Sequence, residues 1–141
     1  MPMKQSAFLA IASAALVSLA GCSASADIKA AEQAVPHFHE QLDGGQFEQI
    51  WAGTSDDLKK VATQADFVAL LTAVHRKLGG HKSEKEQGWS TNVTTSGTFV
   101  SLTYATAYDG GDAVERFVFR MDKDRALLAG YNINSNALIL K

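Results

Sequence analysis

One carboxylate and three hydroxyl side chains fall together on two neighbouring apolar segments in the C-terminal half of the chain. Glu115 lies in the second segment, and Tyr104, Thr106 and Tyr108 follow one another at intervals of two in the first. In β-strands this spacing puts side chains on one face of the sheet. A carboxylate framed by phenols at the mouth of an apolar cavity can act as a general base, because burial raises its pKa. We therefore predict a small-ligand pocket at these four residues. The alternative is that Glu115 is solvated near a hairpin end.

The single cysteine follows a short apolar segment near the N-terminus. Residues 7–20 are apolar, and all 15 acidic residues come after Cys22. The segment is shorter than the roughly 20 residues that a membrane-spanning helix needs, so the pattern predicts an export signal peptide over residues 1–21. The sequence LAGC at positions 19–22 resembles the lipobox of bacterial lipoproteins. This implies cleavage before Cys22 and lipid attachment to it, for example palmitate. The alternative is an ordinary export signal with an incidental cysteine.

The residue after the cysteine carries a further implication. Ser23, by the same resemblance, implies delivery of a lipoprotein to the outer membrane, with the domain facing the periplasm. Residues 22–26 then form a short lipidated tether, and residues 27–141 form one domain. Several acyl chains anchor a protein firmly where one chain binds only marginally. We therefore expect the domain to stay at the membrane surface of the cell envelope.

The histidine spacing does not predict a metal site. His37 and His39 are two apart on a predicted helix, which points them about 200° apart. We expect His75 at the edge of an apolar stripe and His81 solvated at the start of a strand. One cysteine excludes a multi-thiolate zinc site. Since the sequence also lacks a nucleophile elbow, a phosphate loop and a zinc-protease motif, we predict no metal and no cofactor.

The elements that must position these residues change their period at Gly80. Before it, apolar residues recur every three or four positions, which predicts helices, with Pro36 marking a kink or a boundary in the first. After it, residues alternate with a period of two and short turns intervene, which predicts antiparallel hairpins. The expected helices span 27–42, 46–52 and 64–78, and the expected strands span 81–94, 98–109, 112–121 and 126–135. Helices packed on one face of a curved four-stranded antiparallel sheet give an α+β fold.

The turn residues also predict how the strands pair. A two-residue loop at Gly110-Gly111 places Thr106 opposite Glu115, and a loop at Ser96-Gly97 brings Trp89 to the same apolar face. This register sorts apolar and polar residues onto opposite faces, as a sheet buried on one side requires. A three-residue loop in the last hairpin puts four residues on the core side: Leu127, Ala129, Tyr131 and Ile133.

Five stretches carry a family resemblance. They are DGGQFEQIW at 43–51, FVALL at 67–71, RKLG at 76–79, VSLTY at 100–104 and GY at 130–131. Together they resemble a family of small bacterial envelope proteins, the domain of unknown function 4019, over most of residues 30–135. With the order of elements, the resemblance implies the cone-shaped cystatin-like or nuclear-transport-factor-like superfamily. Ala126 stands where such sequences often carry Trp. That superfamily hosts both enzymes and binding modules, so it implies no particular reaction.

Composition sets limits on the class of function. The chain has 141 residues, 46% hydrophobic, with 13 basic and 15 acidic side chains. This is one globular domain without the basic excess of a nucleic-acid binder. We predict a lipid-anchored, non-catalytic binding or accessory domain for an envelope partner protein or a small ligand at the membrane surface. The alternative is a small isomerase or hydrolase that uses Glu115 with Tyr104 or Tyr108.

Overall fold

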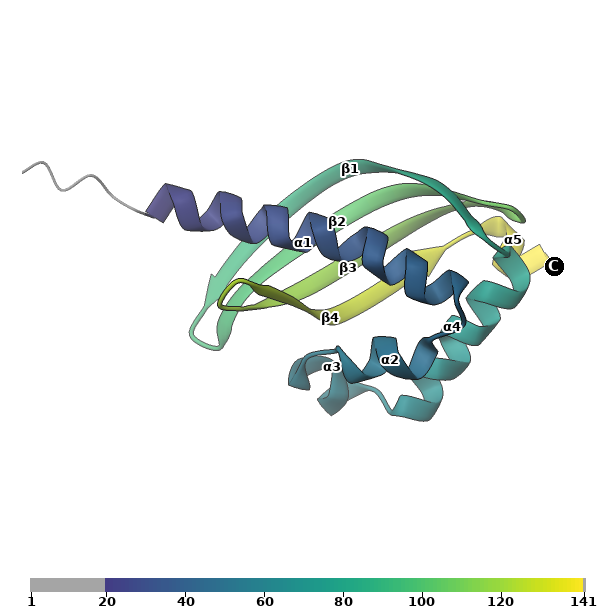
Figure 1. Cartoon of the computed structure of the whole chain (residues 1–141), viewed down its shortest axis with the longest axis horizontal. Coiled ribbons are helices and arrows are strands. Elements are labelled where there is room, and N and C mark those ends of the chain that lie inside the picture. The colour runs from purple at the N-terminus through teal and green to yellow at the C-terminus, as the bar shows by residue number, and fades with distance from the viewer. Residues whose placement is uncertain (1–19, 141) are drawn as a thin grey trace, which may run out of the picture.

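A long helix lies along the concave face of a four-stranded sheet, and three shorter helices pack beneath it (Figure 1). The computed structural model describes residues 20–140. The helices are α1 (Ala20–Asp43), α2 (Phe47–Ala52), α3 (Asp56–Val61), α4 (Gln64–Leu78) and the C-terminal α5 (Asn136–Leu140). The strands are β1 (His81–Thr94), β2 (Gly97–Tyr108), β3 (Gly111–Asp122) and β4 (Arg125–Asn134), paired in this order. The predicted α+β class, with helices N-terminal to an antiparallel sheet, is confirmed.

Helix α1 supplies the main apolar stripe on the sheet. Ala31, Val35, Phe38 and Leu42 recur every three or four residues and are at most 5% exposed. Pro36 lies inside this helix, so of the two predicted outcomes, a kink or a boundary, the boundary is wrong. Proline removes one backbone hydrogen bond from the helix interior, but the buried stripe continues on both sides and holds the helix together.

The start of α1 coincides with the predicted lipid site. Residues 23–26, predicted as a tether, are helical and exposed. The side chain of Cys22 and the predicted signal residues 1–19 lie outside the described part of the chain, so lipid attachment stays a prediction. Within residues 20–140, no helix is both long enough and apolar enough to cross a bilayer.

Local signals fix both ends of α4. The Thr63 hydroxyl accepts a hydrogen bond from the Asp66 amide at 3.1 Å, as expected of a helix N-cap. At the other end Gly79 has φ +70°, a conformation that glycine adopts without steric cost. The chain then turns directly into β1.

The β2–β3 register differs from the predicted one by two residues. Tyr108 pairs with Gly111, so Glu115 lies opposite Tyr104 rather than Thr106. Because side chains alternate with a period of two, this shift leaves every residue on its predicted face. The same offset places Trp89 opposite Leu102. Trp89 is 55% exposed because β1 is an edge strand.

A bulge in β4 overturns part of the predicted last hairpin. Asp122 pairs with Arg125 across a two-residue turn, not three. Val118 then pairs with Gly130 while Phe119 pairs with Leu128, which leaves Ala129 as the extra residue. A bulge of this kind switches the alternation of the strand. Leu128 is therefore buried in place of Leu127 and Ala129, whereas Tyr131 and Ile133 pack against the core as predicted.

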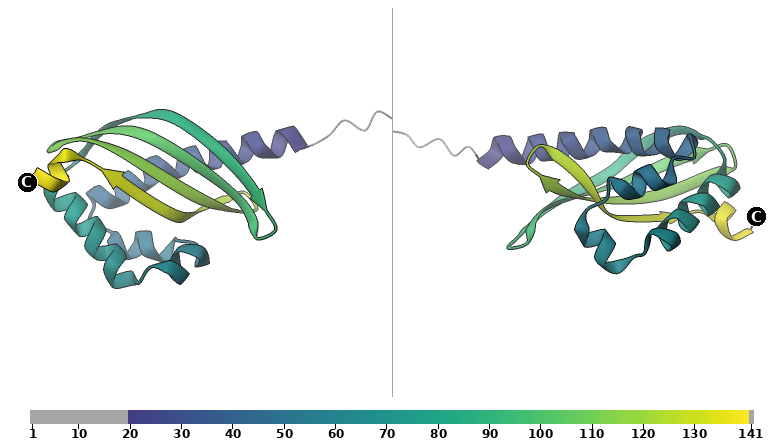
Figure 2. Two further views of the ribbon diagram at one scale, coloured as in Figure 1. Left: turned by 180° about the vertical axis from the view of Figure 1, so that it is seen from behind. Right: turned by 60° about the horizontal axis from the view of Figure 1, so that its bottom comes forward.

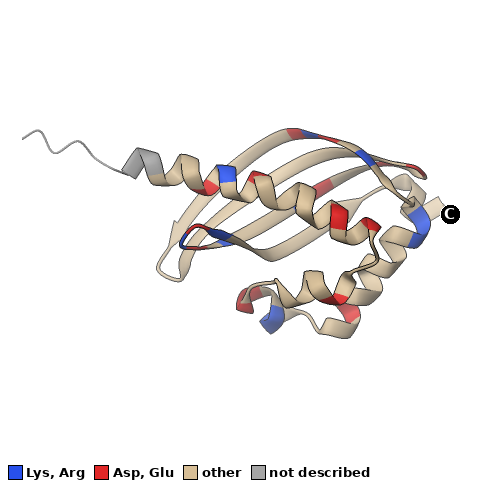
Figure 3. Cartoon of the chain, viewed as in Figure 1, with Lys and Arg blue, Asp and Glu red and all other residues tan. Residues whose placement is uncertain are grey.

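The outer face of the sheet carries no helix among residues 20–140, as the reverse view shows (Figure 2, left). Charged residues of both signs are interspersed over the elements (Figure 3). One of them joins two layers, since Arg120 on β3 donates hydrogen bonds to both carboxylate oxygens of Asp57 on α3, at 2.9 and 3.1 Å.

The β2–β3 turn lies close against the end of α4, and this contact yields a prediction. A Cβ atom added at Gly110 would lie 2.7 Å from the carbonyl oxygen of Lys77. We expect Gly110→Ala to lower the free energy of unfolding by about 1–3 kcal/mol, because the turn must move away from backbone atoms. Chemical denaturation measures it. Gly88→Ala is the matched control, since a Cβ there meets nothing within 4 Å. Equal losses of stability in the two variants would contradict the claim that the turn packs too closely on α4 to accept a side chain.

Candidate functional site

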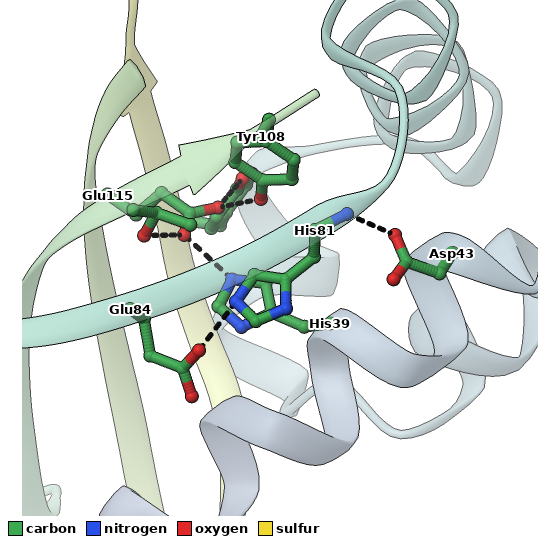
Figure 4. Close-up of polar contacts among 8 residues, drawn as sticks. His39, Asp43, His81, Glu84, Tyr108 and Glu115 are labelled. Atoms are coloured by element: carbon green, nitrogen blue, oxygen red, sulfur yellow. Dashed lines mark hydrogen bonds and ion pairs between the residues drawn. The ribbon is translucent and has the colours of Figure 1, made fainter. Parts of the chain in front are cut away.

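Glu115 is the centre of a buried polar cluster between α1 and the sheet. Its side chain has no exposed surface, and four side chains bind its two carboxylate oxygens (Figure 4). His39 Nε2 and Thr106 Oγ1 donate to Oε2 at 2.7 and 2.6 Å. Tyr108 and Tyr131 donate their hydroxyl protons to Oε1 at 2.7 and 2.6 Å. The donors come from α1, β2 and β4, so this carboxylate joins the helix to three strands.

The cluster favours the charged form of the carboxyl group. Burial by itself raises the pKa of Glu115, but the hydrogen bond and charge of His39, together with the hydroxyls of Thr106 and Tyr131, bring it below its usual 4.5. An ionised carboxylate offers lone pairs for all of these donors, whereas a protonated one does not. The site is therefore built to hold an anion, not to release and take up a proton near neutral pH.

The two phenols at the site are held neutral. Burial, followed by the charge of Glu115, raises the pKa of Tyr108 and of Tyr131 far above its ordinary value of 10. They therefore remain protonated hydrogen-bond donors at neutral pH. The ring of Tyr131 also covers one side of the Glu115 cluster, because it packs against Phe38 and Phe117 with ring centroids 4.8 and 5.2 Å apart.

The structure brings three of the four predicted pocket residues together. Thr106 and Tyr108 donate hydrogen bonds to Glu115, whereas Tyr104, which lies directly opposite Glu115 in the sheet, directs its hydroxyl elsewhere. The Tyr104 hydroxyl instead approaches Glu86 on β1 at a long 3.5 Å. Burial of Tyr104 and the charge of Glu86 raise the pKa of the Tyr104 hydroxyl to about 12. Tyr104 thus belongs to a separate contact at the sheet edge.

Sequence reasoning missed two ligands of the carboxylate, His39 and Tyr131. His39 is four residues after Val35 and 2% exposed, so its place on the apolar stripe of α1 was a readable signal. The two-residue spacing predicts only that His39 and His37 point apart, and they do, with His37 68% exposed. Tyr131 was placed on the core side, but no local pattern links it to a residue on another strand.

His81 is not solvated as predicted. Its ring stacks on His39 with centroids 4.1 Å apart and planes 12° apart, and its side chain is only 17% exposed. The backbone amide of His81 donates to Asp43 at the end of α1, at 2.9 Å. The Gly-Gly turn thus folds the start of β1 over α1 and buries the imidazole. Its Nε2 lies 2.5 Å from Glu84 Oε2.

The four donors on Glu115 yield a prediction about stability. Glu115→Gln keeps the shape but replaces one acceptor oxygen by an NH₂ group that faces hydrogen-bond donors. We expect the free energy of unfolding to fall by about 3 kcal/mol, the range for breaking a buried ionic contact. Urea unfolding at neutral pH measures it. Glu86→Gln is the control, because the Tyr104 hydroxyl approaches Glu86 only at a long 3.5 Å. The carboxyl group of Glu32, the other neighbour of Glu86, can also form a hydrogen bond with the new amide, so little change is expected. A tolerated Glu115→Gln would contradict the assignment.

A second prediction concerns acid. The folded-state pKa of Glu115 lies below 4.5, so its contribution to stability is complete above that pH and is lost as the pH falls through the folded value. We expect the stability of the native chain to decline more steeply than that of Glu115→Gln as the pH falls below 4.5. Urea unfolding at a series of pH values measures both curves. Parallel curves would show that Glu115 titrates normally.

Comparison with known proteins places the chain in a family. No curated protein matches the sequence. A family model described as "Protein of unknown function (DUF4019)" matches residues 34–131, which include all five side chains of the Glu115 cluster. This span covers more than half of the chain, and it confirms the resemblance carried by the five stretches. The chain therefore belongs to the family of proteins of unknown function DUF4019.

Proposed function

We propose that this chain is a lipid-anchored protein of the bacterial cell envelope whose domain binds a partner protein or a small ligand at the membrane surface without catalysis. The observation that carries the proposal is the complete burial of Glu115. A carboxylate with no exposed surface and four donors already bound acts as a structural anion. The alternative of an isomerase or hydrolase gains no support from this geometry, because a substrate cannot reach the carboxylate.

The surface offers a better place for a ligand. A hollow of about 270 Å³ lies between α1, α2 and the β3–β4 hairpin. Apolar side chains form much of its wall, and polar groups stand among them, as in many small-molecule sites. Its lining includes Ala34, Phe38, Ile50, Phe119, Ala126 and Leu128 among the apolar residues, and His37, Gln41, Gln49 and Arg125 among the polar ones. This volume suits one large side chain of a partner or one small apolar ligand.

The small residue at position 126 helps to keep this hollow open. Ala126, whose side chain is a single methyl group, lies in its wall. An indole there would occupy much of the space. The hollow is thus a feature of this chain that a single substitution can remove.

Helix α1 connects the predicted anchor to the hollow. It begins before Cys22 and runs without interruption to Asp43, and Ala34, His37, Phe38 and Gln41 on this helix line the hollow. The rise of 1.5 Å per residue puts Cys22 about 22 Å along the axis from His37. A lipid on Cys22 would therefore hold the hollow within a few nanometres of the membrane, which supports a role in binding at its surface.

The test combines the anchor and the hollow in living cells. A photo-crosslinking residue at Gln49, on the rim, is expected to form a discrete adduct when the chain is intact. The adduct should disappear in Cys22→Ala, because the domain is no longer held at the membrane, and in Ala126→Trp, because the hollow is filled. A crosslinker at the exposed Lys82 is the matched control. An adduct that persists unchanged in both variants would overturn the proposal, and so would its absence from the intact chain.

A further inference from the structure

We propose that His39, His81 and Glu84 form a binding site for a divalent transition-metal ion, with Zn²⁺ as the best fit. The three residues come from the end of α1 and the start of β1 and meet beside the Glu115 cluster (Figure 4). One potential ligand atom from each lies within 4.8 Å of the other two. This site is separate from the hollow of the proposed function and shares no residue with it.

His39 is already arranged as a metal ligand is. In the neutral ring Nε2 donates to Glu115 Oε2 at 2.7 Å and Nδ1 keeps a free lone pair; a metal ion at Nδ1 would displace the proton that the charged ring carries there. Among the described residues, no group forms a hydrogen bond with this buried Nδ1 atom. Histidines that bind a metal through one nitrogen characteristically donate the other N–H to a carboxylate, which fixes the ring and strengthens the ligand. Glu115 supplies that orienting carboxylate, and an ion at Nδ1 would satisfy the unpartnered atom.

His81 and Glu84 supply the second and third ligands. His81 Nε2 is also buried and lacks a hydrogen bond within the described chain. It lies 2.5 Å from Glu84 Oε2, an ion-pair distance without hydrogen-bond geometry. The two rings stack with planes 12° apart, so an ion in the plane of both requires the His81 ring to turn about its side-chain bonds. Exposures of 17% for His81 and 22% for Glu84 leave an entry path from solvent.

The donor set selects the kind of ion. Two imidazole nitrogens and one carboxylate oxygen suit Zn²⁺ and similar first-row ions, whereas Ca²⁺ and Mg²⁺ prefer oxygen ligands alone. Three protein ligands leave a fourth tetrahedral position to water or to a ligand atom. Glu84 and Glu115 provide negative charge to balance the ion. The geometry thus points to an open, partly exposed site at the junction of α1 and β1.

The test uses the untagged full chain carrying Cys22→Ala, so that its only thiol cannot bind metal. Isothermal titration with Zn²⁺ should show one site, and Co²⁺ in its place should give the visible absorption bands of a four- or five-coordinate centre. In this background His81→Ala and Glu84→Gln should each weaken Zn²⁺ binding about tenfold or more and abolish the Co²⁺ bands. His37→Ala is the matched control, because His37 lies on the same helix but is 68% exposed, and it should bind as before.

Two results would overturn the proposal. One is the absence of Zn²⁺ binding and Co²⁺ bands in the parent chain, which would leave His81 and Glu84 as an ion pair. The other is binding that survives both His81→Ala and Glu84→Gln but is lost in His37→Ala, which would place an adventitious ion on the exposed histidine. Circular dichroism checks that each variant is folded, and Glu84→Gln decides the question if His81→Ala is not. None of these readouts depends on the crosslinking that tests the proposed function.

Discussion

The buried negative charge of Glu115 is the constraint on which the rest of the structure depends. An ionised carboxylate without exposed surface is strongly unfavourable unless charged and hydrogen-bonded partners replace water. Here the partners are His39 from α1, two side chains from β2 and Tyr131 from β4. The helix and three strands must therefore assemble together before the charge is satisfied. Apolar side chains around the carboxylate, such as Phe38 and Phe117, stabilise the fold by burying their surface. The hydrogen bonds of the carboxylate then favour the one packing arrangement in which all of its donors reach it.

This role is one of specificity more than of net stability. Apolar packing tolerates a strand shifted by two residues, because the shift keeps every side chain on its face. The carboxylate disfavours a shift in one direction, which would carry Glu115 away from Thr106 and Tyr108, whereas a shift in the other direction would place it opposite Thr106. The carboxylate also provides a hydrogen-bond partner for the buried His39. The ring of His81 stacks on His39. The candidate metal site thus depends on this buried group through His39, whereas the hollow between α1, α2 and the β3–β4 hairpin lies elsewhere on the surface.

Periodicity and turn residues were enough to predict the longer helices, the four strands and the class of fold, and the resemblance of five short stretches was enough to predict the family. They were also enough to place Glu115, Thr106 and Tyr108 on one buried face. They failed where the outcome depends on contacts between distant segments. The glycines at 110 and 111 allow a two-residue loop at 109–110 or at 110–111, and this choice changes the strand pairing by two residues; the bulge at Ala129 has no local signature. His39 and Glu115 are 76 positions apart, so only the packing of α1 on the sheet reveals that they meet.

The most direct test of the central claim is a double-mutant cycle between His39 and Glu115. His39→Gln, Glu115→Gln and the double variant are compared with the native chain by urea unfolding at neutral pH. If the buried carboxylate holds α1 on the sheet through His39, the two substitutions are strongly non-additive, with an interaction free energy of about 1.5–3 kcal/mol. A value indistinguishable from zero would contradict the account, because it would mean that helix and sheet are held together by apolar packing alone.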